Sequence, residues 1–120
     1  MLEKITSEYA KFPDSLIEGI CFFPISKKSD STIEVTLSCY NLKKENKKET
    51  IKLIFTKIEL VKFNQLNDNP SLFLDEIYID GRNDLITFDF FPIDHFDYLE
   101  ENPNSNFIIK CRKVEFEVLK

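Results

Sequence analysis

A strict alternation of apolar and polar residues in the segment 32–40 constrains the fold of this chain more than any other feature. Every second residue from Ile33 to Cys39 is apolar, and the residues between them are Glu, Thr and Ser. This period of two predicts a strand with one buried face. The alternation resumes at 51–55 and changes phase between 56 and 63, which predicts a β-bulge, a bend or a change of sheet.

The remaining segments indicate more strands and little helix. Apolar residues spaced by three and four predict a short helix over 2–12, and Asp94 ahead of an acidic stretch predicts a short helical turn near 94–101. Further strands are expected at 16–25 (irregular or at an edge), 72–80, 84–93 and 106–119, with a turn at 81–83, a solvated hairpin tip at 41–49, a loop at 64–71 and a bulge near Arg112 and Lys113.

Short strands separated by turns, without alternating helices, are typical of a mainly β (α+β) protein. We predict an antiparallel β-sandwich or half-open barrel of five to seven strands, formed by residues 1–120 as a single domain. The chain has twelve Phe and no Trp. We expect the Phe rings to fill the core.

The N-terminal residues alternate charged and apolar side chains and have no continuous apolar run of the export type. No apolar stretch approaches the roughly 20 residues that span a bilayer. We therefore expect a cytoplasmic protein that does not interact with membranes.

Glycine and cysteine usage exclude several kinds of site. Gly19 and Gly81 are the two glycines, so the chain has no glycine-rich phosphate loop. Cys21, Cys39 and Cys111 are far apart and lack the spacing of a metal-binding pair, and we expect them to be buried thiols in a reducing compartment. We predict no cofactor and no bound metal.

His95 is the single histidine, and Asp94 and Asp97 could orient it as a general base. No motif such as G-x-S-x-G fixes a nucleophile for it. The same acidic segment does not match the calcium loop of an EF-hand. We therefore predict that the protein is not an enzyme.

The charge is unevenly distributed along the chain. The segment 75–101 contains nine acidic residues and the single cation Arg82, a balance of −8, whereas the whole chain carries −5. The segment 42–62 has a balance of +4 but no aromatic residue between Tyr40 and Phe55. Nucleic-acid binding surfaces usually combine basic residues with aromatic ones, so we do not expect a nucleic-acid partner.

The acidic segment is the candidate surface for a cationic protein partner, because a concentrated negative field steers such a partner and nearby rings can anchor it. The rings in this segment are Tyr78, Phe91, Phe96 and Tyr98. The candidate partner-binding residues are Asp75, Glu76, Asp80, Asp84, Asp94, Asp97, Tyr98, Glu100 and Glu101. The alternative is that these acids only keep a Phe-rich domain in solution.

The order of elements resembles that of small cytoplasmic immunity proteins from bacterial toxin systems, including contact-dependent growth inhibition. The resemblance lies in the N-terminal helix, the turn at 12–17, the alternating strands at 33–39 and 53–61, and the closing strand at 114–116, with Pro13 where the pattern has His. It implies a non-enzymatic inhibitor that covers the active site of a cognate toxin, such as a nuclease with a basic cleft. Alone, such a protein is expected to be a monomer or a weak homodimer.

A structural or adaptor β-domain is the alternative function. It would act by homodimerisation or by pairing a strand with a partner. The predicted last strand is rich in charged residues, which protects an edge against such pairing. A small hydrolase built around His95 is a third interpretation.

Overall fold

The computed structural model describes residues 1–25, 30–64 and 73–120. It contains one α-helix, α1 (Leu2–Tyr9), and two 3-10 helices, η1 (Leu42–Lys44) and η2 (Arg82–Asp84). Its strands are β1 (Ser15–Phe23), β2 (Thr32–Asn41), β3 (Lys47–Phe63), β4 (Phe73–Leu74), β5 (Tyr78–Asp80), β6 (Ile86–Asp89), β7 (Ile93–Asp94), β8 (Leu99–Glu100) and β9 (Phe107–Val118). No helix in these ranges is long and apolar enough to cross a membrane.

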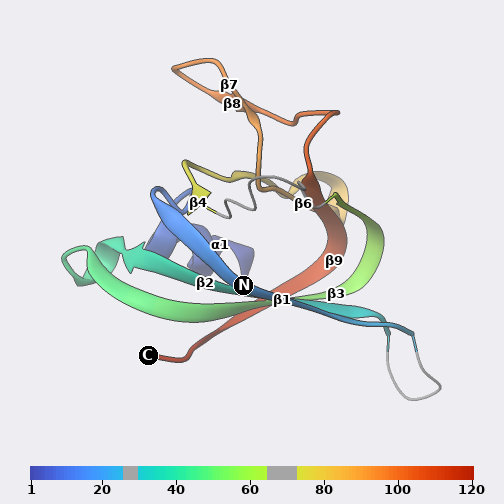
Figure 1. Ribbon diagram of the computed structural model, residues 1–120, viewed down its shortest axis with the longest axis horizontal. Helices are drawn as coiled ribbons and strands as arrows, with labels where there is room; N and C mark the ends of the chain where they lie inside the picture. Colours follow the sequence, from blue (N-terminus) through green and yellow to red (C-terminus); the bar gives the residue numbers. More distant parts are fainter. Residues whose placement is uncertain (26–29, 65–72) are drawn as a thin grey trace.

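Seven of the strands form one antiparallel sheet in the order β4-β1-β2-β3-β9-β6-β5. The two longest strands, β3 and β9, pair along most of their length and bend the sheet into a half-barrel (Figure 1). The register between them shifts between Ile58 and Leu60, and Lys57 beside the shift has a positive φ of 53°. The bulge that the phase change predicted is therefore confirmed, as is the half-barrel.

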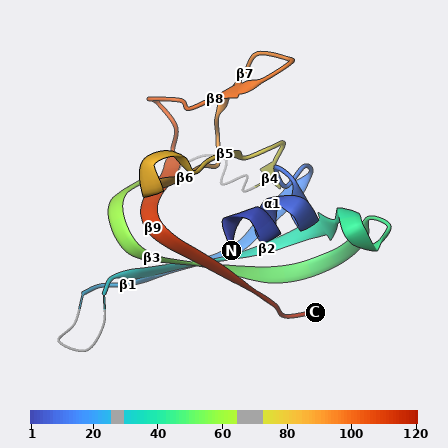
Figure 2. The same cartoon turned by 180° about the vertical axis from the view of Figure 1, so that it is seen from behind.

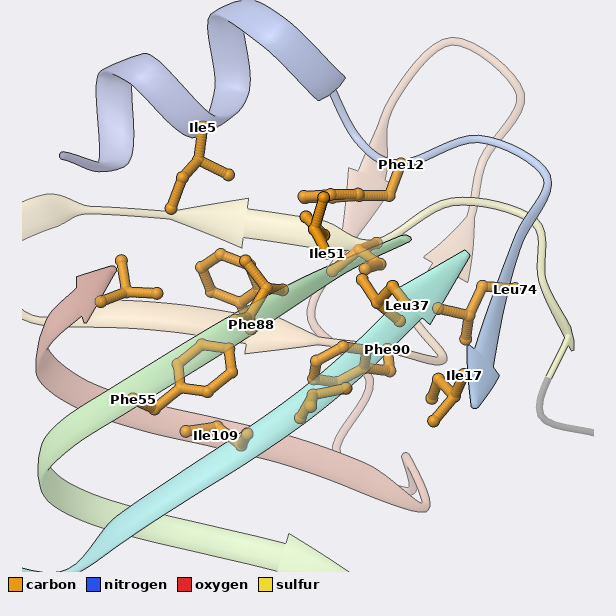
Figure 3. Packing of buried hydrophobic residues seen from close by; sticks show 14 of the residues in the cluster. Ile5, Phe12, Ile17, Leu37, Ile51, Phe55, Leu74, Phe88, Phe90 and Ile109 are labelled. Carbon is orange, nitrogen blue, oxygen red and sulfur yellow. The ribbon is translucent and has the colours of Figure 1, made fainter. Parts of the chain in front are cut away.

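Helix α1 lies against the concave face of this sheet (Figure 2). Its buried residues Ile5 and Tyr9 are one turn apart and therefore point to the same side. They pack with the inward-facing residues of the strands, such as Leu37 and Ile51, in one continuous apolar cluster (Figure 3). The core therefore lies between a single curved sheet and one helix.

The gap between the two edges of the half-barrel is bridged by the chain itself. Segment 75–77 joins β4 at one edge to β5 at the other, and Ile77 within it is fully buried. The backbone N–H of Ile77 donates to Lys11 O at 2.8 Å, and the N–H of Asp14 donates to Asp75 O at 3.0 Å. The turn after α1 thus fastens the bridging segment and keeps the acidic residues around it at the surface.

Several predicted boundaries are wrong. The predicted helix 2–12 ends at Tyr9, because Ala10 adopts a positive φ of 52°. The predicted helical turn near 94–101 is a hairpin of β7 and β8, in which Asp94 pairs with Leu99. The bulge expected near Arg112 and Lys113 is displaced. The buried face of β9 does change phase at these two residues, but the register shift between β3 and β9 lies between Ile58 and Leu60 of β3. Residues 65–71 of the predicted loop 64–71 lie outside the described residues. So does residue 72, the first of the predicted strand 72–80.

Two expectations about burial are wrong in part. Five of the twelve Phe are buried, but five others are at least 49% exposed: Phe22, Phe23, Phe63, Phe73 and Phe96. Cys39 and Cys111 are buried as expected, whereas Cys21 is exposed. The Phe content therefore serves both the core and the surface.

Candidate functional site

The acidic hairpin, formed by residues 93–100, is the clearest candidate for a binding site. It contains β7 and β8 and stands away from the body of the molecule in both views (Figures 1 and 2). Ile93 pairs with Glu100 and Asp94 with Leu99, and a four-residue loop connects the two strands. Projection into solvent makes this loop accessible to a partner from several directions.

The loop has a defined conformation. The backbone N–H of His95 donates to Tyr98 O at 3.0 Å, and the carboxylate of Asp94 accepts from the N–H of Phe96 at 2.8 Å. The rings of His95 and Tyr98 stack with their centroids 4.6 Å apart, and His95 Nε2 lies 3.2 Å from Glu100 Oε1. These contacts fix the conformation of the loop and leave its tip, where Phe96 is located, exposed to solvent.

Phe96 is the most unusual residue of the acidic hairpin. Its side chain is fully exposed, and its backbone has a positive φ of 84°, which is rare and unfavourable for a bulky residue. Eight other non-glycine residues of the described ranges also have a positive φ, so it is the full exposure of its ring that distinguishes Phe96. An exposed aromatic ring surrounded by carboxylates has the chemistry of an anchor for a cationic partner.

The base of the acidic hairpin is fixed to the sheet by a buried carboxylate. Asp89 is fully buried and accepts from the N–H of Asn102 at 2.7 Å and from that of Phe91 at 3.0 Å. The side chain of Asn102 donates to Phe91 O at 3.2 Å, which ties the two strands of the stem together. Asp89 therefore has a structural role, and the hairpin projects from a hydrogen-bonded base.

Two other acidic residues of the segment 75–101 are paired with cations. Asp80 accepts from Arg82 at 3.0 Å, and Glu101 pairs with Lys110 at 3.0 Å. Among the described residues, Asp97 accepts no hydrogen bond and pairs with no cation. The carboxylate of Asp97, next to Phe96, is thus the one in the loop that is available to a partner.

The structure does not gather all nine predicted residues into one surface. Asp94, Asp97, Tyr98 and Glu100 belong to the acidic hairpin, and Glu101 follows it directly. Asp75 and Glu76 lie in the segment that bridges β4 and β5, and Asp80 is on β5. Asp84 lines a separate pocket of about 440 Å³ whose wall includes Arg112 and Lys113, so its surroundings have mixed charge.

A second polar cluster connects α1 to the hairpin of β2 and β3. Glu49 is 4% exposed and accepts from the Tyr9 hydroxyl at 2.8 Å, from Asn41 Nδ2 at 3.0 Å and from Lys44 Nζ at 3.3 Å. Asn41 Nδ2 also donates to Glu8 at 3.2 Å. The segment 41–49 was expected to be fully solvated, and its two buried ends are a correction to that expectation. They are buried because they meet the last turn of α1.

The ionisation of this cluster is that of a structural network. Burial works to raise the pKa of Glu49, but the hydrogen bonds from Asn41, Tyr9 and Lys44 outweigh it and hold that pKa below its ordinary value. Burial, followed by the charge of Glu49, raises the pKa of the Cys39 thiol to about 12. The thiol is therefore protonated near neutral pH and is not a nucleophile there.

Neither cluster has the composition of a metal site. In the described ranges, no group of three or more His, Cys, Asp or Glu side chains is placed to hold a metal ion. His95 has Glu100 as its carboxylate neighbour, rather than Asp94 or Asp97. In the sequence, Phe96 is one of four rings in the acidic segment, and only the hairpin geometry distinguishes it from the others.

The chain matches no protein-family model, no curated protein and no solved structure. Its function is therefore argued from the acidic hairpin itself.

Proposed function

We propose that this protein is a non-enzymatic inhibitor that binds a basic cleft of a protein partner through the acidic hairpin. The observation that carries the proposal is Phe96, an aromatic residue that is fully exposed at the tip of a hydrogen-bonded, acidic projection. A ring in this position enters a pocket of a partner at little entropic cost, because the loop is already ordered.

The charge around the ring indicates the kind of partner. Asp97 adjoins Phe96, and Asp94 and Glu100 lie on the two strands behind it. Carboxylates arranged along a projection can occupy sites that bind phosphates, and they attract a basic surface over a distance set by the salt concentration. Nuclease domains bind phosphate groups in basic clefts, and a toxin with nuclease activity would therefore fit the acidic hairpin. In that case the partner is a cognate bacterial toxin and this chain is its immunity protein.

The decisive experiment first searches the reading frames next to that of this chain for a secreted protein with a toxic C-terminal domain, and then uses that domain. Its activity is measured with increasing amounts of wild-type protein and of Phe96→Ala. We expect wild type to inhibit stoichiometrically and the variant to bind about 30-fold more weakly, the loss typical of a central aromatic anchor. The fold of the variant should be unchanged because the Phe96 side chain contacts solvent only.

Two outcomes would contradict this proposal. Full inhibition by Phe96→Ala at the wild-type concentration would exclude the hairpin tip as the anchor. Absence of binding between the wild-type protein and the neighbouring domain would exclude the immunity role. An unfolded variant is recognised beforehand by circular dichroism.

A further inference from the structure

Within residues 1–25, 30–64 and 73–120, one edge of strand β1 has no partner strand over most of its length. On one side, it pairs with β2 from Leu16 to Phe23, but on the other side β4 pairs only with Ser15 and Leu16. Within the described residues, no strand and no backbone hydrogen bond from a loop satisfies the outer edge at 18–23. Alternate N–H and C=O groups of this segment, which we call the free edge of β1, therefore have no partner among the described residues.

The central part of the free edge, residues 19–23, lacks the charged side chains that usually protect an exposed edge against pairing. Exposed edges generally carry Lys, Pro or inward-pointing charges, whereas residues 19–23 carry no charge at all. Phe22 is 57% exposed and Phe23 is 49% exposed. The β-bulge between Ile17 and Gly19 and the proline at position 24 bound the segment. Five consecutive uncharged residues are thus available for strand pairing.

An apolar groove continues from this edge onto the concave side of the sheet. It has a volume of about 380 Å³ and is lined by residues of β1, β2, β3 and β9. Its lining residues are Ile20, Phe22, Ile33, Val61, Phe63 and Phe107. Ile20 and Phe22 belong to both the groove and the free edge, so a strand added at the edge would also cover part of the groove.

We propose that the free edge of β1 pairs with the same edge of a second copy of this chain. The pairing is antiparallel and symmetric about Cys21, so that the two sheets continue into one another. In this register, Ile20 faces Phe22 of the second copy on the concave side, and Gly19 faces Phe23 of the second copy on the other side. A second copy fits because both pairs are complementary: Ile20 and Phe22 are both apolar, and the large Phe23 side chain faces a glycine.

The pairing of Gly19 with Phe23 provides the most specific argument. A Cβ atom added to Gly19 would meet no atom within 4 Å, so the surface above this glycine is open. An aromatic ring from a neighbouring strand can cover such a glycine and bury its own face. The symmetric register places a Phe23 ring over a Gly19 twice, once on each side of the two-fold axis.

Charge does not oppose the contact. Glu34, the β2 neighbour of Cys21, is neutralised by Lys52 at 3.4 Å, and the five central residues are uncharged. The acidic hairpin lies elsewhere on the molecule (Figure 2). The dimer therefore leaves both hairpins available, and the inference does not depend on the proposed function. A five-residue strand pair with its rings buries less than about 1,200 Å², which implies a weak, concentration-dependent dimer.

The test measures mass by sedimentation velocity from low micromolar to near-millimolar protein. Wild type should shift from monomer to dimer over this range. Cys21→Ser should behave in the same way. Cys21→Lys, which places two like charges at the axis, should raise the dissociation constant about tenfold or more. Cys21 is exposed, so neither substitution disturbs the core.

A second readout tests the register. Diamide accepts two electrons and two protons from a pair of thiols, and opposed residues in antiparallel strands are close enough for the resulting disulfide. Wild type should form a covalent dimer through Cys21 and Cys21→Ser should not. A wild-type protein that stays monomeric throughout would overturn the proposal, as would a dimer that Cys21→Lys leaves unchanged. A non-covalent dimer without the disulfide would overturn the register.

Discussion

Replacement of Glu49 by alanine tests the link between α1 and the sheet. The substitution removes the acceptor of the Tyr9 hydroxyl and of one Asn41 N–H, both of which are buried. Hydrogen bonds to a charged group contribute about 1.5–3 kcal/mol each, whereas the pair with the half-exposed Lys44 contributes at most about 1 kcal/mol. We therefore expect the free energy of unfolding to fall by about 3–6 kcal/mol, mostly through the two buried hydrogen bonds.

Two variants separate the causes of this loss. Glu49→Gln keeps an acceptor for Tyr9 and Asn41 and should lose about 1–2 kcal/mol. Lys44→Ala removes only the exposed ion pair and should lose less than about 1 kcal/mol. The assay is urea denaturation followed by circular dichroism, with the midpoint read at an unchanged slope.

A loss below about 1 kcal/mol in Glu49→Ala would refute the reasoning, because it would mean that Tyr9 and Asn41 find other partners. A loss in Lys44→Ala as large as that in Glu49→Ala would also refute it, because the ion pair would then be the main contribution.

Three further predictions concern Glu49, Phe96 and the three cysteines. The pKa of Glu49 is lowered in the folded protein, so its contribution is complete above the ordinary carboxyl pKa and is lost as the pH falls through the folded value. Acid should thus destabilise wild type more steeply than Glu49→Gln, as urea midpoints measured from neutral pH to well below the ordinary carboxyl pKa of 4.5 will test. Phe96→Gly relieves a positive φ and should not lower stability in the same assay, although it removes the anchor. A thiol reagent at neutral pH should modify Cys21 in the native protein and modify Cys39 and Cys111 only after unfolding, because burial raises the pKa of Cys39 to about 12 and of Cys111 to about 11. Equal labelling of all three would contradict that prediction.

The strands were predictable where one face of the sheet is buried along its length. Segment 32–40 alternates because β2 has the core on one side, and the phase change after 55 marks a real register shift. The curvature of the half-barrel was not visible locally, because it arises from the pairing of β3 with β9 some fifty residues later.

The hairpin at 93–100 shows why the candidate site was only partly predictable. An Asp side chain that accepts from the N–H two residues later occurs both at the start of a helix and in a turn, so Asp94 favoured a helix in the sequence. The pairing of Ile93 with Glu100 across the two strands favours the hairpin over the helix. Glu49 was placed in solvent because its partner Tyr9 is forty residues away. The acidic composition of the site was readable, but the exposure of Phe96 was not.

Binding of a basic partner by the acidic hairpin is tested most directly by titration calorimetry of Asp97→Lys with the toxin domain that the search of neighbouring reading frames identifies. Glu117→Lys, at the far end of β9, is the matched control. We expect Asp97→Lys to weaken binding at least tenfold and to flatten its salt dependence, and Glu117→Lys to bind as wild type does. Equal affinities and equal salt dependence for the two variants would contradict it.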